Sequence, residues 1–121
     1  KVNICGAIET VSAIVKSIQK EVDNYEEVII WSAGHRALAL MAIAKLSKIK
    51  YVVDSAIFKQ GKFTPILHKK IISPKEFTRI QCDLLIVMLP GNYAEQVIRF
   101  IEENHVTCKV VVFDDKELLS E

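Results

Sequence analysis

The apolar and polar positions of this chain follow two alternating periodicities. Over residues 7–25, apolar side chains recur at steps of three and four with charged residues between them, which predicts an amphipathic helix. Residues 27–32 are continuously apolar after the glutamate at their start, as is typical of a parallel strand covered on both faces. The same two patterns then predict a second helix over residues 35–47 and a second strand over residues 49–53.

The second half of the chain repeats this alternation after a loop. Ser73 followed by Pro74 has the residue types of a helix N-cap and a first helical position. In chain order we expect a loop (55–65), a short edge strand (71–72), a brief helix that begins at Ser73 and Pro74, a strand (83–89), a helix (94–104) and a last strand (109–113).

Strands that alternate with helices predict a single parallel sheet. Right-handed crossovers make 3-2-1-4-5 the expected order of its five strands. We therefore expect one Rossmann-like, three-layer α/β domain over residues 1–121, with a leading amphipathic helix in residues 1–25 and the α/β core in residues 26–121. In such sheets, ligands bind beyond the carboxyl ends of the strands, where the strand order reverses.

Length and composition narrow the possible classes of protein. With 121 residues, half of them hydrophobic and 26% charged, the chain has the size and composition of one globular domain. Its net charge of +1 gives no field that would attract nucleic acid or a membrane. No apolar run reaches the roughly 18 residues of a membrane span, and no signal-peptide pattern is present. Because the chain begins with Lys1 rather than Met, we expect it to be part of a longer protein.

The cysteines and histidines do not form a recognisable metal or redox motif. Cys5, Cys82 and Cys108 are widely separated and no Cys-x-x-Cys occurs, which argues against a structural zinc site and against a dithiol redox centre. Cys82 and Cys108 are expected to be small, half-buried residues at strand starts. A reducing cytoplasm is the expected location. The three histidines lie on separate segments without carboxylates at ligand spacing, so we expect no metal site.

The turn between the first strand and the second helix is the first candidate site, and it contains Ser32, Gly34, His35 and Arg36. Backbone N–H groups at a helix N-terminus, together with an arginine, suit a phosphate or a carboxylate. With one glycine, the turn does not meet the dinucleotide fingerprint G-x-G-x-x-G. The alternative is that Gly34 only makes the turn and that Arg36 is solvated.

Two further groups of residues are expected at the same edge. Asp54 ends the second strand 20 residues after Gly34, the interval at which an acidic residue meets a ribose hydroxyl, although acidic residues also end strands without this role. Asn92 and Tyr93 follow the fourth strand; alternatively, Asn92 caps the next helix and Glu95 favours its N-terminal dipole. No Ser-His-Asp order, nucleophile elbow or P-loop accompanies them, so we predict no catalytic residue in this chain.

The loop FKQGKFTP, residues 58–65, is a third candidate. It holds two lysines, a glutamine, two aromatic residues and a glycine within eight residues, a composition that favours a contact surface. We therefore expect Lys59, Gln60 and Gly61 to belong to the site. The alternative is a charged and solvated connection.

Taken together, these segments resemble the C-terminal domain of bacterial sugar C-methyltransferases. The matching segments, in the order and spacing of that family, are WSAGHR (31–36), YVVD (51–54), FKQGKFTP (58–65), ISPKEF (72–77) and NYAEQV (92–97). The resemblance covers about residues 25–105, and Lys59-Gln60-Gly61 after the Val-Val-Asp strand end is its most specific element. The chain departs from the family at Ser32, where many relatives have glycine, and at His35-Arg36, where others have Lys-Gly.

The resemblance implies that this chain is the substrate-side domain of an S-adenosylmethionine-dependent C-methyltransferase acting on a nucleotide-activated deoxysugar. In such enzymes this domain contributes to nucleotide-sugar binding and packs on the methyl-donor domain of the same parent chain. The zinc module, the S-adenosylmethionine site and the catalytic base belong to the other domains. The resemblance therefore implies a chain that holds no cofactor and is not catalytic alone.

Two other functions are compatible with the sequence. One is a free-standing Rossmann-like module for NAD, CoA or a nucleotide, with Asp54 on the ribose. The other is a structural or oligomerising domain, because the apolar stripe of residues 7–25 is available to pack on the sheet, on a neighbouring domain or in a homo-oligomer.

Overall fold

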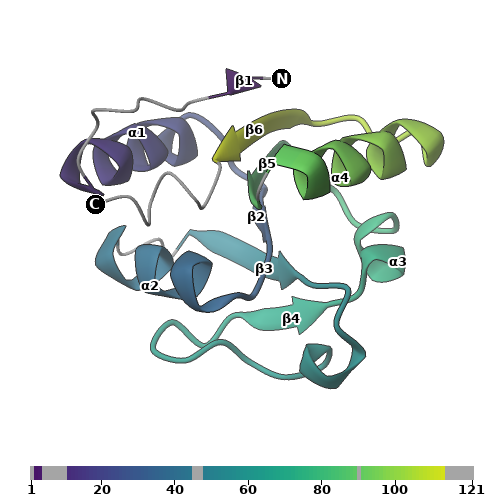
Figure 1. Ribbon diagram of the computed structural model, residues 1–121, viewed down its shortest axis with the longest axis horizontal. Helices are drawn as coiled ribbons and strands as arrows, with labels where there is room; N and C mark the ends of the chain where they lie inside the picture. The colour runs from purple at the N-terminus through teal and green to yellow at the C-terminus, as the bar shows by residue number, and fades with distance from the viewer. Residues whose placement is uncertain (1, 4–10, 45–47, 90, 114–121) are drawn as a thin grey trace.

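The structure of the protein, a computed structural model, describes residues 2–3, 11–44, 48–89 and 91–113. Within these residues six parallel strands form one sheet in the order β1-β6-β5-β2-β3-β4 (Figure 1). The strands are β1 (Val2–Asn3), β2 (Val28–Trp31), β3 (Ile49–Val53), β4 (Lys70–Ile72), β5 (Leu84–Met88) and β6 (Lys109–Phe113). The helices are α1 (Val11–Asp23), α2 (His35–Ala44), α3 (Pro74–Phe77) and α4 (Gly91–Glu103), with a 3-10 turn η1 (Ile57–Lys59).

The order of β2 to β6 confirms the predicted 3-2-1-4-5 arrangement and the Rossmann-like three-layer fold. The β1 strand was not predicted. Its two residues pair with Val111 and Val112 of β6 and extend the sheet at that edge. A segment of two residues is too short for any periodicity, so the pairing is visible only in three dimensions.

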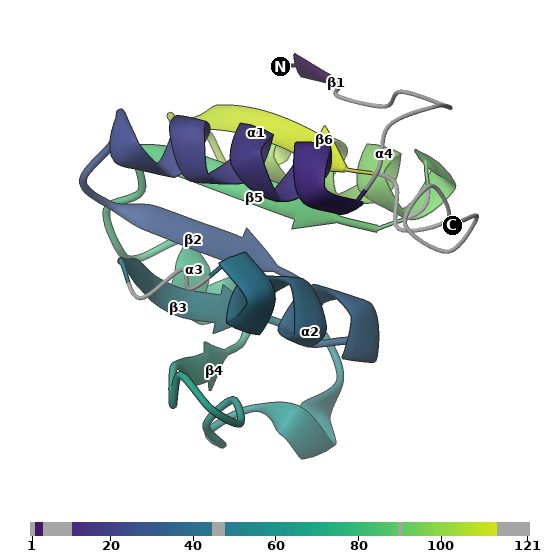
Figure 2. The same ribbon diagram turned by 90° about the vertical axis from the view of Figure 1, so that its left-hand side faces the viewer.

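Helices cover both faces of the sheet: α1 and α2 lie on one face, and α3 and α4 on the other (Figure 2). Side chains of β2 alternate between these layers, with Val28 and Ile30 toward α1 and α2, and Ile29 and Trp31 toward α3 and α4. All residues of β2 and β5 are buried. Burial on both faces explains why their sequences are uninterrupted apolar runs rather than alternating ones.

The leading helix packs on the sheet. Ile18 and Val22 of α1 are buried in the same core cluster as Val28 of β2 and Leu84 of β5. These two residues of the apolar stripe are thus covered by the sheet, in agreement with the first of the alternatives for this helix. The predicted start of this helix (7–10), the predicted end of the second helix (45–47) and the polar tail (114–121) lie outside the described residues.

The helix α3 begins as its sequence predicts. The Ser73 side chain accepts a hydrogen bond from the Glu76 N–H, and the Glu76 carboxylate accepts one from the Ser73 N–H, both at 3.1 Å. These two bonds form a capping box around Pro74. By contrast, α4 begins at Gly91, so Asn92 lies inside its first turn. The alternative in which Asn92 caps this helix is therefore wrong.

Candidate functional site

Two hollows open at the carboxyl edge of the sheet, next to the turn that joins β2 to α2. The first of them lies where the strand order reverses, between the ends of β2 and β5, which is where the sequence predicts a ligand. The first hollow has a volume of about 370 Å³ and is lined by Trp31, Ser32, Asp54, Ser55, Pro74, Leu89, Tyr93, Gln96, Val97 and Phe100. The second has a volume of about 310 Å³ and is lined by Ala33, Gly34, Leu38, Phe58, Lys59, Lys62, Phe63 and Ile71.

Aromatic side chains form the wall of the first hollow. Trp31 at the end of β2 contacts Phe77 and Phe100 edge to face, with ring centroids 5.6 Å apart in each pair. Tyr93, in the first turn of α4, is 53% exposed and lies at the rim. Apolar walls with a few polar groups are typical of sites that hold a small organic ligand.

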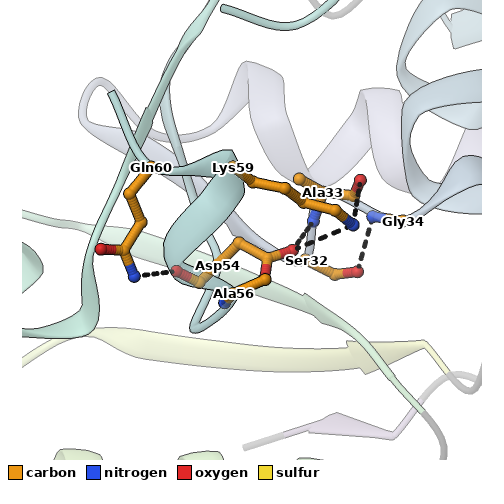
Figure 3. A network of polar contacts seen from close by, with 7 residues as sticks. All are labelled: Ser32, Ala33, Gly34, Asp54, Ala56, Lys59 and Gln60. Carbon is orange, nitrogen blue, oxygen red and sulfur yellow. Dashed lines mark hydrogen bonds and ion pairs between the residues drawn. The ribbon is translucent and has the colours of Figure 1, made fainter. Parts of the chain in front are cut away.

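A network of polar contacts joins Asp54, which lines the first hollow, to Lys59, which lines the second (Figure 3). One carboxylate oxygen of Asp54 accepts a hydrogen bond from the Ala33 N–H at 2.8 Å, and the other accepts one from the Ala56 N–H at 2.8 Å. The Lys59 ammonium lies 3.8 Å from the first of these oxygens and donates to the Ala33 carbonyl at 3.3 Å. The Gln60 side-chain amide donates to the Asp54 carbonyl at 2.9 Å. These bonds fix the residues after β3 against the turn after β2.

Two N–H groups of the turn already have acceptors within the chain. The Ala33 N–H is bonded to Asp54, and the Gly34 N–H is bonded to the Ser32 hydroxyl at 3.2 Å. The negative group at this turn is the carboxylate of Asp54 itself. Phosphate binding at the turn, and the contact of Asp54 with a ribose, stay predictions; either ligand would share or replace these bonds.

Ser32 has a backbone conformation that favours glycine, with φ at 132°. Its N–H donates to the Val53 carbonyl at 2.8 Å, and its hydroxyl accepts from Gly34, so both bonds hold the strained residue in place. The backbone at position 32 therefore favours glycine over the serine that the chain has there.

The structure brings most of the predicted site residues together at this edge. Ser32, Asp54 and Tyr93 line the first hollow, Gly34 and Lys59 line the second, and Gln60 belongs to the network between them. Gly61 has φ at 82°, and its N–H donates to the Ile71 carbonyl at 2.8 Å, so it shapes the loop. Asn92 is exposed and lines neither hollow. For His35 and Arg36 the structure describes the backbone, as the start of α2, and not the side chains.

Sequence reasoning missed part of the first hollow. Gln96, Val97 and Phe100 follow Tyr93 at steps of three and four, so they lie on the same face of α4 and reach the same cavity. This helical spacing was a signal that could have extended the site from Tyr93 along the helix. Pro74 belongs to the lining because α3 begins beside the same edge.

The loop between β3 and β4 exposes large apolar side chains. We define the apolar loop patch as Ile57, Phe58, Phe63 and Ile66, whose side chains are 61% to 82% exposed. The segment 57–72 that carries them contains four lysines and no carboxylate. Ile66 has φ at 66° within a tight turn closed by the Leu67 N–H and the Pro65 carbonyl at 2.7 Å, which is unusual for a β-branched residue. Exposed apolar groups of this size mark interaction sites.

Within the described part of the chain, no group of three or more histidine, cysteine, aspartate or glutamate side chains is arranged to hold a metal ion. Among the described helices, none has the length and apolar character needed to cross a membrane.

The fold and the position of the hollows define the chain as a Rossmann-like α/β domain. A family model described as the C-methyltransferase C-terminal domain matches residues 7–112. The chain therefore belongs to the C-methyltransferase C-terminal domain family.

Known proteins similar to this chain were found by sequence and by structure. Protein MGF 360-5L of African swine fever virus is 33% identical over 89 residues, which cover 64% of this chain and 24% of the viral protein. The crystal structure of RSP, a Rex-family repressor, matches with a TM-score of 0.56 at 12% identity, over 90% of this chain and 64% of the repressor. RSP in complex with beta-NAD+ and operator DNA matches with a TM-score of 0.51 at 13% identity, over 90% of this chain and 61% of that chain.

The chain spans about a quarter of the viral protein and less than two thirds of the repressor chains. At these identities, the likeness to the repressor structures shows the fold alone.

Proposed function

We propose that this chain is the substrate-side domain of an S-adenosylmethionine-dependent C-methyltransferase that acts on a nucleotide-activated deoxysugar. The observation that carries the proposal is the aromatic hollow at the carboxyl edge of the sheet, in a chain that belongs to the C-methyltransferase C-terminal domain family. In this proposal the domain binds part of the substrate, and S-adenosylmethionine and zinc are held by other domains of the parent protein.

The two hollows suit different parts of a nucleotide-sugar. Ligand pockets are usually roughly 300–1,000 Å³, so the first hollow, at about 370 Å³, has room for one ring system rather than the whole molecule. Trp31, Tyr93 and Phe100 offer aromatic surface to a base or a sugar ring. Lys59 and Lys62 line the second hollow and offer positive charge to a diphosphate. The substrate would thus lie across the Asp54 network.

The apolar loop patch supports a docking role in the same protein. Its four exposed side chains belong to a segment, residues 57–72, that contains four lysines and no carboxylate, so an acidic surface with apolar groups would complement it. We propose that the methyl-donor domain of the parent chain covers this patch. A second copy of the chain would cover it in a homo-oligomer, and size-exclusion chromatography with light scattering distinguishes the two: a monomeric isolated chain favours the donor domain.

The proposed function is tested by titrating the chain with a thymidine-diphosphate deoxysugar, with NAD and S-adenosylmethionine as comparison ligands. Trp31 is the chain's single tryptophan and lines the first hollow, so its fluorescence reports binding directly. We expect the sugar nucleotide to change this fluorescence, and both Tyr93→Ala and Lys62→Ala to weaken binding by about tenfold each. Lys20→Ala, at an exposed position on α1, is the matched control and should bind normally.

Two outcomes of this titration would contradict the proposed function. If the sugar nucleotide binds but neither variant weakens it, the hollows are not the site. If neither the chain nor its parent protein binds the sugar nucleotide, the substrate role is refuted.

The fold likeness to a repressor solved with beta-NAD+ favours a second candidate, a dinucleotide-binding module. Binding of NAD alone would support that candidate.

A further inference from the structure

Two thiols meet at the amino edge of the sheet, opposite the hollows. Cys82 lies two residues before β5, and Cys108 lies directly before β6. The strand register pairs Leu84 with Lys109, and the Lys109 N–H donates to the Asp83 carbonyl at 3.0 Å, so the two segments run side by side. Cys82, 6% exposed, belongs to the core cluster beneath α4, and the partly exposed Cys108 packs against that cluster.

The two free thiols contact each other through a side-chain hydrogen bond. Continued past the starts of the two strands, this register places Cys108 beside Asp83, one residue from Cys82. That offset corresponds to Cα atoms roughly 6 Å apart, within the usual range for a disulfide. The shared hydrogen bond lowers the pKa of the Cys108 thiol. The same bond, followed by burial, raises the pKa of the Cys82 thiol. The more accessible thiol is therefore the more readily ionised one.

We propose that Cys82 and Cys108 form a redox-active thiol pair that closes to an intramolecular disulfide when the chain meets a peroxide. The sequence argues against a dithiol centre because it lacks Cys-x-x-Cys, but Cys108, 26 residues after Cys82, is brought to it by the pairing of β5 with β6. Because of this pairing, each cysteine has a second thiol close enough to form a disulfide with it. The proposal is independent of the proposed function.

The reaction has two steps. The Cys108 thiolate attacks one oxygen of hydrogen peroxide, the O–O bond breaks, and the other oxygen leaves as hydroxide, which takes up a proton to become water. Cys108 then carries a sulfenic acid. The Cys82 sulfur attacks the Cys108 sulfur, the S–O bond breaks, and the hydroxyl leaves as water with the proton of the Cys82 thiol. Two electrons pass from the two sulfurs to the peroxide.

The disulfide would join the starts of β5 and β6 and enclose α4 in a covalent loop. Because closing a loop of this length restricts the unfolded chain, we expect the thermal midpoint to rise by roughly 10 °C. The bond lies at the edge of the sheet opposite the hollows, so Trp31 fluorescence should stay unchanged. Oxidation is thus expected to act on stability without altering the candidate ligand site.

The test uses the chain with Cys5→Ser, which removes the third thiol. After treatment with hydrogen peroxide, we expect the intact mass to fall by two hydrogen atoms, a peptide map to show Cys82 linked to Cys108, and dithiothreitol to reverse both the link and the rise in thermal midpoint. In the Cys82→Ser variant, Cys108 should instead accumulate as a sulfenic acid that dimedone traps. In the Cys108→Ser variant, buried Cys82 should stay reduced.

The proposal would be overturned by oxidation of Cys108 to a sulfinic acid with Cys82 still a thiol, or by full alkylation of both thiols after peroxide treatment. A disulfide between two chains would overturn it as well. Should the Cys82→Ser or Cys108→Ser variant fail to fold, the peptide map of the chain that carries only Cys5→Ser still decides the question.

Discussion

The carboxylate of Asp54, at the end of β3, accepts a hydrogen bond from the backbone N–H of Ala33, in the turn after β2, at 2.8 Å. The two residues lie on neighbouring strand ends, and the bond ties together the two loops that line both hollows. Ala33 lies two residues before α2 begins, so the carboxylate holds the segment that leads into this helix. The geometry of the candidate site therefore depends on this carboxylate whether or not a ligand binds.

Asp54→Asn should destabilise the fold by about 1–3 kcal/mol. Each carboxylate oxygen of Asp54 accepts a hydrogen bond from a backbone N–H. In the asparagine variant, the side-chain NH₂ would face one of these two N–H groups in either orientation of the amide, and that hydrogen bond would be lost. Urea denaturation measures the change. Asp23→Asn, at an exposed position at the end of α1, is the matched control and should change stability by less than about 0.5 kcal/mol. Equal effects of the two substitutions would contradict the role of Asp54 in the network.

Ser32→Gly should leave the protein more stable than Ser32→Ala, by about 1 kcal/mol or more. Both substitutions remove the hydroxyl that accepts from the Gly34 N–H, but only glycine relieves a backbone with φ at 132°. Because both variants lose the same hydrogen bond, the difference between their free energies of unfolding reports the cost of the backbone conformation at position 32. Thermal or urea unfolding of both variants gives the difference, and an alanine variant as stable as the glycine variant would show that no strain is present.

Gly61→Ala should destabilise the protein by about 1 kcal/mol. A Cβ at this position would meet no atom within 4 Å, so the effect arises from the backbone, whose φ is 82°. Gly34→Ala is the matched control: its Cβ would lie 3.4 Å from the Ser32 hydroxyl oxygen, an ordinary contact. Its expected effect is below about 0.5 kcal/mol. If the control were the more damaging substitution, the turn after β2 would need glycine more than this loop does.

Stability should depend on pH through Glu76. The hydrogen bond from the Ser73 N–H holds the pKa of this carboxyl below its usual range. Because the folded-state pKa is lowered, its contribution is present above the unfolded-state pKa and is lost as the pH falls through the folded-state value. Glu76→Gln should therefore lower the urea midpoint at neutral pH and have no such effect in strong acid. A difference that persists unchanged in acid would assign the effect to packing instead.

The sequence predicts the fold well where a single physical cause acts locally. Uninterrupted apolar runs identify β2 and β5 because both faces of these strands are buried. The order of the strands follows from the handedness of the crossovers. Ser73 and Pro74 predict the start of α3 because a cap depends on only a few neighbouring residues.

The site is less predictable because it depends on which segments the sheet brings together. Asp54 was found from its place at a strand end, but its bonds to Ala33 and Ala56 depend on how two loops pack. The contact of Cys82 with Cys108 arises from the register of β5 and β6, for which the sequence contains no spacing signal. The two residues of β1 likewise join the sheet only because the edge of β6 is available.

The central pairing of the sheet has a consequence for how the chain folds. Val28 of β2 lies beside Leu84 of β5, so the pairing joins residues 56 positions apart. Because every strand pairing in the described sheet is parallel, each connects segments that are distant along the chain, and much chain entropy must be lost before the sheet gains stability. We expect a refolding rate slower than that of a helical bundle of the same length, limited by the meeting of β2 with β5.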